Sequence, residues 1–336
     1  MSMHGLKPAS LLALMVALAT YFIAGDASWL DTSTIIAIYA LIALSVGVSF
    51  GMAGILSVAQ AAFAALGAYT TAILTARYGV HPYWGLIAAV AVPAAFAYPF
   101  SRLLTRMSPL ALALATLIFG HILDHALRDG GGFTGGYIGI SGIPPLPFVS
   151  DPLQTHLFAW GLVVVVALLY GNLHGSSYGA SMRTIKVDTL RAQADGINVP
   201  HMRSVAMTIA AGLAGLGGWL YAHYIAYLAP DSLDPNLSIS VLLMAIAGGT
   251  ATVLGPVIGA VVLTVVSTLI PGGEATGMFY GGVLLAVLLL APKGLLPLLS
   301  SAIKRQTRLV KPSAKGADAG LRSVLEAETG RKERVK

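Results

Sequence analysis

The chain has 336 residues and no cysteine. This absence excludes a disulfide framework, cysteine-ligated zinc or iron–sulfur sites and thiol catalysis. Charge is also scarce: 10% of the residues are Asp, Glu, Lys or Arg, against roughly 25% in an average soluble domain. Three long stretches, 32–76, 204–230 and 235–273, carry no charged side chain. A soluble fold of this size needs charges on its surface, so the solvent of this protein is largely lipid.

Two functional patterns are also missing. The sequence has no G-x-x-x-x-G-K-[ST] and no H-E-x-x-H. Nothing therefore holds nucleotide phosphates in the P-loop manner, and the zinc-protease pattern is excluded. Energy for any work that the chain performs has to come from a partner or from an ion gradient.

Apolar runs long enough to cross a membrane recur along the chain. A helix needs about 20 apolar residues to cross the hydrocarbon core. Such runs lie at residues 9–25, 33–50, 53–76, 83–104, 109–127, 156–171, 204–229, 252–270 and 277–297, with a shorter one at 238–249. The sequence predicts an all-α polytopic membrane protein with about 8–10 transmembrane helices, depending on the run 238–249 and the junction at Phe50–Gly54.

The two ends of the chain differ in character, because the first is apolar and the last is basic. Residues 1–25 are expected to be an uncleaved first helix, with a cleaved signal peptide as the alternative. Residues 304–336 hold ten Lys and Arg against four Asp and Glu, which accounts for the net charge of +6. We expect residues 301–336 to be a solvated, disordered basic tail near anionic lipid rather than a nucleic-acid-binding segment, and residues 1–300 to be the transmembrane domain.

The basic loops predict the orientation of the spans. The segment after the fourth run and the segment after the sixth are basic, at Arg102, Arg106, Arg183, Lys186, Arg191 and Arg203. Acidic residues mark the other side, at Asp26, Asp31, Asp124, Asp129, Asp151, Asp231, Asp234 and Glu274. Because basic loops stay in the cytoplasm, both termini are predicted to be cytoplasmic.

Two glycine-rich clusters interrupt the apolar runs, at residues 51–72 and 238–260. Broken helices survive in lipid only where they line a cavity or pack against other helices, so these clusters predict broken or re-entrant segments of a transport path. Their similar composition in the two halves of the chain is consistent with a possible inverted repeat. The candidate path residues are Ser57, Gln60, Thr70, Thr71, Gly248, Gly249 and Thr250.

Each cluster also has a plainer interpretation. Gly47-x-x-x-Gly51 and Gly255-x-x-x-Gly259 have the spacing that lets transmembrane helices pack closely. Thr70 and Thr71 can bond back to their own helix. Gln60 is harder to explain by packing alone, because a buried amide in an apolar span needs a partner.

The pattern H-x-x-D-H at His121, Asp124 and His125 puts three polar side chains on one helical face. It permits a metal site or a proton relay, but the set lies near a predicted membrane interface and has no further ligand cluster beside it. We therefore predict no bound metal or cofactor. Two alternatives stay open: an ion-coupled secondary transporter, which requires an intramembrane carboxylate such as Asp124, and a membrane-embedded enzyme using these three residues.

Two polar segments separate the spans. The Gly- and Pro-rich loop at about residues 128–155 is predicted to face outward, as a surface connection or as a contact for a partner. The segment at about residues 172–203 is predicted to be cytoplasmic, with a short helix from Met182 to Asp195 that Gly196 ends. That helix either lies on the membrane surface or docks a cytoplasmic subunit.

Six stretches lie in order between about residues 33 and 297: "GILSVAQAAFAALGAYTTA", "LALATLIFG", "FTGGYIGISGIPP", "ADGINVPHMR", "GLAGLGGWLYAHYIAYLAPDS" and "SISVLLMAIAGGTATVLGPVIGA". In this order they resemble the permease subunits of branched-chain amino acid ATP-binding cassette importers, of the LivM type.

The resemblance implies a non-catalytic subunit in the bacterial inner membrane. It would pair with a second, LivH-type permease, two ATP-binding cassette subunits and a periplasmic substrate-binding protein. Its cargo would be branched-chain amino acids or related small amino acids, amides or organic acids. The segment 172–203 would be the coupling loop, with contacts to the ATPase at Arg183, Asp188, Arg191, Ala192 and Gly196.

Two departures from the family pattern stand out. Such permeases usually have an acidic residue, a hydrophobic residue and two alanines in the coupling loop, where this chain has Thr189, Leu190, Arg191 and Ala192. After "ATLIFG" the usual acidic and basic residues are replaced by His121 and Asp124, a reversal that predicts an intramembrane polar pair.

Overall fold

A computed structural model describes residues 5–104, 107–147, 149, 151–269, 281–282 and 294–295. The chain divides into two units, residues 1–296 and 297–336, and every described residue belongs to the first unit. The predicted tail at 301–336 and most of the predicted span at 277–297 lie outside the described residues.

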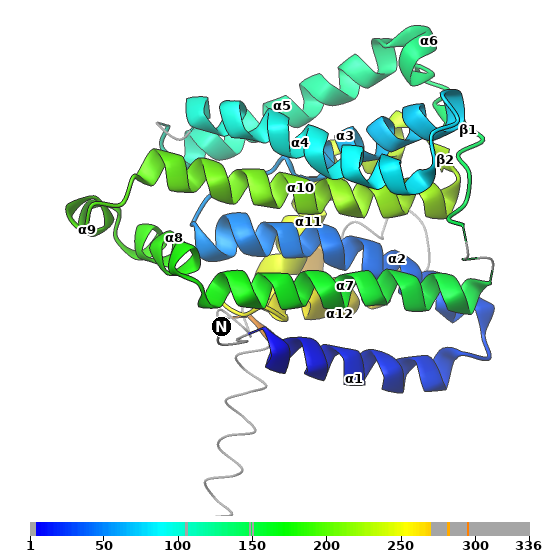
Figure 1. The fold of residues 1–336 in the computed structure, drawn as a ribbon, viewed down its shortest axis with the longest axis horizontal. Helices are drawn as coiled ribbons and strands as arrows, with labels where there is room; N and C mark the ends of the chain where they lie inside the picture. The colour runs from blue at the N-terminus through cyan, green and yellow to red at the C-terminus, as the bar shows by residue number, and fades with distance from the viewer. Residues whose placement is uncertain are drawn as a thin grey trace, which may run out of the picture. The chain divides into compact units, whose positions relative to one another are not determined.

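The first unit is built almost entirely from helices (Figure 1). In its first half the elements are α1 (Leu6–Ile23), α2 (Ala27–Val46), the π-helix η1 (Gly47–Met52), α3 (Gln60–Ala72), the π-helix η2 (Ile73–Arg77), α4 (Pro82–Leu104), α5 (Pro109–Asp129), α6 (Gly131–Thr134) and β1 (Ile140–Ser141). In its second half they are α7 (Pro152–Gly175), α8 (Ser177–Val187), α9 (Thr189–Ala194), α10 (Val199–Ile225), β2 (Tyr227–Leu228), the 3-10 helix η3 (Pro230–Leu233), α11 (Pro235–Gly248) and α12 (Gly255–Leu269). β1 and β2 form one short antiparallel pair.

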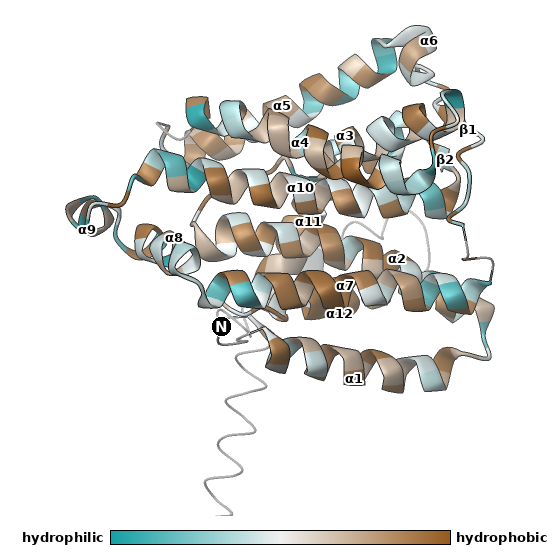
Figure 2. Ribbon diagram, viewed as in Figure 1, coloured by the Kyte–Doolittle hydropathy of each residue, from teal (hydrophilic) through white to brown (hydrophobic). Residues whose placement is uncertain are grey.

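Five helical stretches among the described residues are long and apolar enough to cross a membrane. They are Ala27–Met52, Pro82–Leu104, Pro109–Asp129, Pro152–Gly175 and Val199–Ile225, and two shorter apolar helices accompany them at Pro8–Ile23 and Gly255–Thr268. Figure 2 shows hydrophobic residues along the middle of the helices and hydrophilic ones mainly toward their ends. The chain is therefore an all-α polytopic membrane protein, as predicted.

The helices differ in how much of their surface is covered. In the apolar window of the stretch Ala27–Met52, 83% of residues are buried, and in α10 72% are, whereas only 22% are buried in α4 and in α5. Apolar helix surface in a membrane can face either other helices or lipid, so the buried share rather than the hydropathy identifies the core. α2 and α10 thus form the core, and α4 and α5 lie at its periphery.

Small residues bring α10 close to its neighbours. A Cβ at Gly218 would overlap the carbonyl oxygen of Ala64 in α3, and one at Gly215 would overlap the carbonyl oxygen of Ala89 in α4. Close approach through small residues is how transmembrane helices gain packing contacts in lipid.

The short elements gather at the two ends of the bundle (Figure 1). α8 and α9 lie at one end, while α6 and the β1–β2 pair lie at the opposite end. The single helix predicted from Met182 to Asp195 is two helices, because Asp188 has an extended backbone (φ −151°, ψ 107°) and starts a new helix. The run predicted at 53–76 becomes helical only at Gln60.

Candidate functional site

The chain is interrupted between η1 and α3, and the interruption lies inside the bundle. Residues 53–59 have no helical structure. Nevertheless Ile55, Ser57 and Ala59 are only 5%, 1% and 0% exposed. Non-helical backbone at this depth of a membrane protein needs hydrogen-bond partners supplied by the protein.

Neighbouring helices supply those partners. The backbone N–H of Val58 donates to Thr116 Oγ1 of α5 over 3.0 Å. The backbone N–H of Ala61, in the first turn of α3, donates to Ser238 Oγ of α11 over 2.9 Å. Thr116 and Ser238 therefore fix the interruption from two sides.

Gln60 forms the polar centre of this region. Ser45 Oγ donates to Gln60 Oε1 over 3.0 Å, and Gln60 Nε2 donates to Ser49 Oγ over 3.2 Å. All three residues are 0% exposed. The amide predicted to need a partner thus joins α3 to the end of α2 and to η1.

A second interruption separates α11 from α12. α11 ends at Gly248, and Gly249 takes a φ of 109°, outside the range that side chains favour. The two interruptions meet, because a Cβ at Gly51 in η1 would lie 2.5 Å from the carbonyl oxygen of Thr250. Glycine at position 51 allows this approach of the two backbones.

The remaining predicted path residues have local or distant partners. Ser57 Oγ accepts the backbone N–H two residues later over 3.3 Å. Thr70 Oγ1 donates to the carbonyl of Leu66 in its own helix over 2.6 Å. Thr71, fully buried, lies 3.0 Å from Nε2 of His223 in α10. Thr70 and Thr71 therefore form a second group, more than two turns along α3 from the interruption.

The segment between α7 and α10 folds into a compact unit formed by α8, α9 and the start of α10, which we call the α8–α9 unit. Asp188 Oδ1 accepts the backbone N–H groups of Leu190 and Arg191 over 2.9 and 3.0 Å, an N-cap for α9. Gly196 has a φ of 80° in the turn that follows α9. Capping and this turn explain why the chain forms two short helices here.

This unit has its own small core. Ile185, Ala192 and Val199 form a hydrophobic cluster separate from that of the bundle. Arg183 donates to the carbonyl of His174 at the end of α7, which ties α8 to the bundle. The unit is therefore held together by side chains from α8, α9 and α10.

Its tip is apolar and exposed. Val187 is 86% exposed and Leu190 is 78% exposed, on either side of the break at Asp188. Arg191 is also exposed. Two exposed apolar side chains on an otherwise polar unit favour contact with another protein.

Lys186 connects the unit to the first interruption. Its Nζ donates to the carbonyl of Gly51 over 2.8 Å and lies 5.4 Å from the ring centre of Phe50. The residue as a whole is exposed, but its ammonium lies against η1, and this partial burial lowers the pKa of Lys186.

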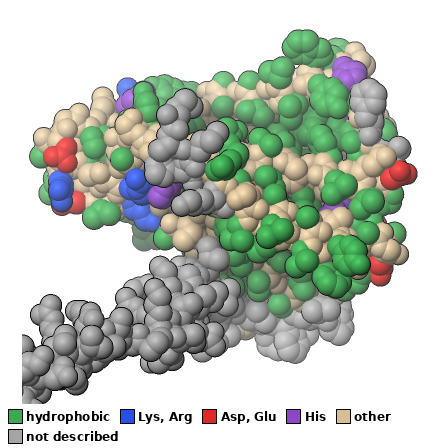
Figure 3. Space-filling view, turned by 60° about the horizontal axis from the view of Figure 1, so that its bottom comes forward, with side chains coloured by type: hydrophobic (Ala, Val, Ile, Leu, Met, Phe, Trp, Pro, Cys, Tyr) green, Lys and Arg blue, Asp and Glu red, His purple; other side chains and the backbone are tan. Residues whose placement is uncertain are grey.

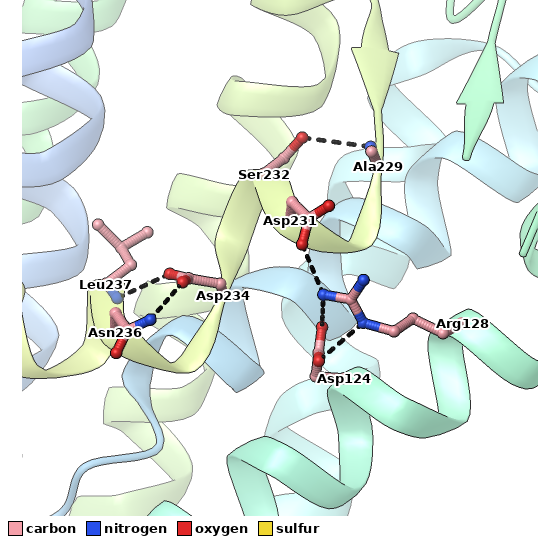
Figure 4. Close-up of polar contacts among 8 residues, drawn as sticks. All are labelled: Asp124, Arg128, Ala229, Asp231, Ser232, Asp234, Asn236 and Leu237. Atoms are coloured by element: carbon pink, nitrogen blue, oxygen red, sulfur yellow. Dashed lines mark hydrogen bonds and ion pairs between the residues drawn. The ribbon is translucent and has the colours of Figure 1, made fainter. Parts of the chain in front are cut away.

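At the end of the bundle opposite the α8–α9 unit, Arg128 of α5 forms ion pairs with two carboxylates (Figure 4). Its Nε lies 2.9 Å from Asp124 of the same helix, and its Nη2 lies 2.6 Å from Asp231 of η3. The structure thus gives Asp124 a basic partner other than His121, which is exposed on α5. Just beyond η3, Asp234 caps α11 by accepting the backbone N–H of Leu237 over 3.0 Å.

Sequence reasoning missed several of these contacts. The sequence marks Lys186 only as a basic loop residue and gives no signal at Val187. It marks Asp231 only as an acidic residue of one membrane side, yet Asp231 forms an ion pair with Arg128. No group of three His, Cys, Asp or Glu side chains suited to a metal lies among the described residues.

Interrupted helices that meet inside a bundle of membrane-spanning helices are typical of membrane transport proteins, and this is the class that the fold and site define. The chain matches the family described as the permease component of the branched-chain amino acid transport system over residues 28–291. The chain belongs to this family.

Three curated relatives agree with this family. The chain is 29% identical over 334 residues to a high-affinity branched-chain amino acid transport system permease protein, LivM, of Salmonella typhimurium, covering 91% of this chain and 77% of the relative. It is 28% identical to LivM of Escherichia coli, covering 92% and 78%. A probable LivM of Methanocaldococcus jannaschii is 25% identical, covering 48% and 53%. Comparison with solved structures gave no match.

Proposed function

We propose that this chain is the non-catalytic permease subunit of an ATP-driven importer for branched-chain amino acids or related small amino acids, amides or organic acids. With a second permease it would form the transport path. Two ATP-binding cassette subunits would hydrolyse ATP, and a periplasmic binding protein would deliver the cargo. Family membership and the names of the relatives support this proposal.

The observation that carries the proposal is the α8–α9 unit. A helix resting on the membrane surface would bury its apolar residues in lipid. Here Ile185 and Ala192 are buried in a protein core instead, while Val187 and Leu190 stand exposed at the tip. A separately packed unit with an apolar tip suits docking to a cytoplasmic subunit.

The distribution of charged side chains supports a cytoplasmic position for the end of the bundle that carries α8 and α9. Figure 3 shows blue Lys and Arg side chains gathered toward the end of the bundle that carries α8 and α9, next to a broad hydrophobic surface. The basic residues of the α8–α9 unit are Arg183, Lys186, Arg191 and Arg203. By the positive-inside rule we infer that this end faces the cytoplasm of a bacterial inner membrane, and we propose that both termini are cytoplasmic.

We place the transport path beside the two interruptions, where Gln60 and Thr250 lie, and extend it along α3 toward Thr71. Interrupted helices leave backbone polar groups that can line a path for a polar cargo. The second permease would supply the other wall of this path.

The ion-coupled alternative gains no support from Asp124. A coupling carboxylate has to exchange its ion or proton during transport. Asp124 instead accepts two hydrogen bonds from Arg128, over 2.9 and 3.2 Å, which neutralise its charge. An enzyme built on His121 and His125 gains no support either, because both side chains are exposed on α5.

The proposal is tested by purifying the tagged chain from mildly solubilised native membranes and identifying its partners. We expect two P-loop ATPases and a second permease. The double variant Val187→Asp, Leu190→Asp should lose the ATPases and keep the permease, because charge at the tip opposes burial against a partner. Ile138→Asp, at an 81% exposed position near β1 at the opposite end, is the control. Retention of the ATPases by the double variant would place the docking surface elsewhere.

A further inference from the structure

Lys186 lies between the exposed tip of the α8–α9 unit and the first interrupted helix. Its neighbour Val187 is 86% exposed, whereas the ammonium of Lys186 donates to the carbonyl of Gly51 over 2.8 Å. Consecutive residues of a helix differ in direction by about 100°. A single turn of α8 therefore presents one side chain to the docking surface and the next to the bundle.

The acceptor is a helix end. Gly51 lies in the last turn of η1 (Gly47–Met52), where carbonyl groups lose their helical partners. A cation at this position satisfies such a carbonyl and complements the negative end of the helix dipole. The ring of Phe50, 5.4 Å from the ammonium, adds a cation–π contact.

The aliphatic part of Lys186 contacts the start of the non-helical segment. A Cβ at Gly54 would lie 3.1 Å from Cγ and 3.3 Å from Cα of Lys186. Gly54 also has a φ of 68°, a conformation that favours glycine. Lys186 therefore touches the interruption at two points, three residues apart.

The same turn of η1 meets the second interruption. The position of a Cβ on Gly51 is 2.5 Å from the carbonyl oxygen of Thr250. The carbonyl of Gly51 thus accepts the hydrogen bond from Lys186, and its α-carbon lies close to the loop between α11 and α12. A shift of α8 that moves Lys186 would therefore change the packing of both interrupted helices.

We propose that Lys186 is the positioning residue through which the α8–α9 unit sets the geometry of the two interrupted helices. The inference rests on the proposed function, since it assigns the α8–α9 unit the role of docking the ATPases. Lys186 acts on the path through Gly51 and does not touch the cargo. Movement of the docked unit would tighten or release the bond to Gly51 and so bias the path between two states.

The test uses the complete importer, reconstituted in proteoliposomes, with two measurements on the same sample: ATP hydrolysed and leucine taken up. Lys186→Met keeps most of the aliphatic stem and removes the ammonium. We expect its ratio of ATP hydrolysed to leucine transported to rise by about five- to tenfold, the lower part of the range of known couplings between sites, because Lys186 is partly exposed. Lys186→Arg should restore much of the wild-type ratio.

A second variant approaches the contact from the other side. Gly54→Ala adds a methyl group against Lys186 at a strained φ, and it should raise the same ratio. Thr184→Ala, one turn or less away on α8 at a residue that bonds back to Ala180, is the matched control and should leave the ratio unchanged. The content of cassette subunits in each preparation shows whether assembly is intact.

The possible outcomes distinguish failure of the role of Lys186 from failure of the proposed importer function. A wild-type ratio in fully assembled Lys186→Met and Gly54→Ala complexes would overturn the positioning role. Loss of the cassettes from Lys186→Met would also overturn it, because Lys186 would then belong to the docking surface. Absence of ATP-driven uptake in the wild-type complex would contradict the proposed function itself.

Discussion

Replacing Gln60 by leucine tests whether the buried amide joins the first interruption to α2. The substitution nearly conserves side-chain size and removes both hydrogen bonds, from Ser45 Oγ to Gln60 Oε1 over 3.0 Å and from Gln60 Nε2 to Ser49 Oγ over 3.2 Å. Because all three residues are 0% exposed, neither lipid nor water is in place to substitute for the amide.

The size of the effect follows from these two bonds. Hydrogen bonds between membrane helices contribute about 0.6 kcal/mol each on average, and at most about 1.7 kcal/mol. The serine hydroxyls keep other acceptors, since Ser45 Oγ also donates to the carbonyl of Ile42 over 2.6 Å and Ser49 Oγ to the carbonyl of Ser45 over 3.2 Å. We therefore expect Gln60→Leu to lower the free energy of unfolding by about 1–2 kcal/mol.

The assay is denaturant unfolding of the purified permease in micelles. Gln193→Leu, at an exposed position in α9, is the control for the effect of the chemical change on unfolding. A double-mutant cycle of Gln60→Leu with Ser45→Ala should give a coupling energy near that of one such bond, about 0.6 kcal/mol. Leucine uptake should fall while the subunits still assemble, because the end of α2 and the start of α3 are no longer held in register. Zero coupling together with normal uptake would refute this reasoning and leave Gln60 a packing residue.

Three further predictions follow from other parts of the chain. Gly196→Pro should uncouple ATP hydrolysis from uptake without loss of membrane insertion, because proline cannot adopt the φ of 80° found there; the ATPase activity and uptake of the complex measure this. Arg128→Leu should lower the melting temperature more than Asp231→Asn, because it leaves Asp124, only 13% exposed, without its cation, while Asp231 is 77% exposed. In double-mutant cycles of transport, Asp124→Asn should couple to Arg128→Gln, and a larger coupling to His121→Ala would favour the polar pair expected from the sequence.

The fold class was predictable because lipid imposes strong rules on a sequence. The charge-free stretch from residue 32 to residue 76 has to lie in the membrane, and its glycines and polar residues marked where the helix is interrupted. The start of α3 at Gln60 was not predictable, because it depends on Thr116 and Ser238, which come from distant helices.

The contacts of the α8–α9 unit show where local patterns fail. The pattern predicts a single helix from Met182 to Asp195. Asp is a common N-cap residue, but only the structure shows that Asp188 starts a new helix there. Lys186 and Gly51 are 135 residues apart in the sequence, so their contact appears only when α8 packs on η1. Likewise Arg128 and Asp231 are 103 residues apart.

The most direct test of the central claim is uptake by the complete complex in proteoliposomes, with ATP enclosed on the side of the cassettes and the binding protein outside. The account predicts that labelled leucine, isoleucine or valine accumulates only when ATP and the binding protein are both present, and that collapsing proton and sodium gradients changes nothing. Accumulation driven by an ion gradient in the absence of ATP would contradict it and establish the secondary transporter instead.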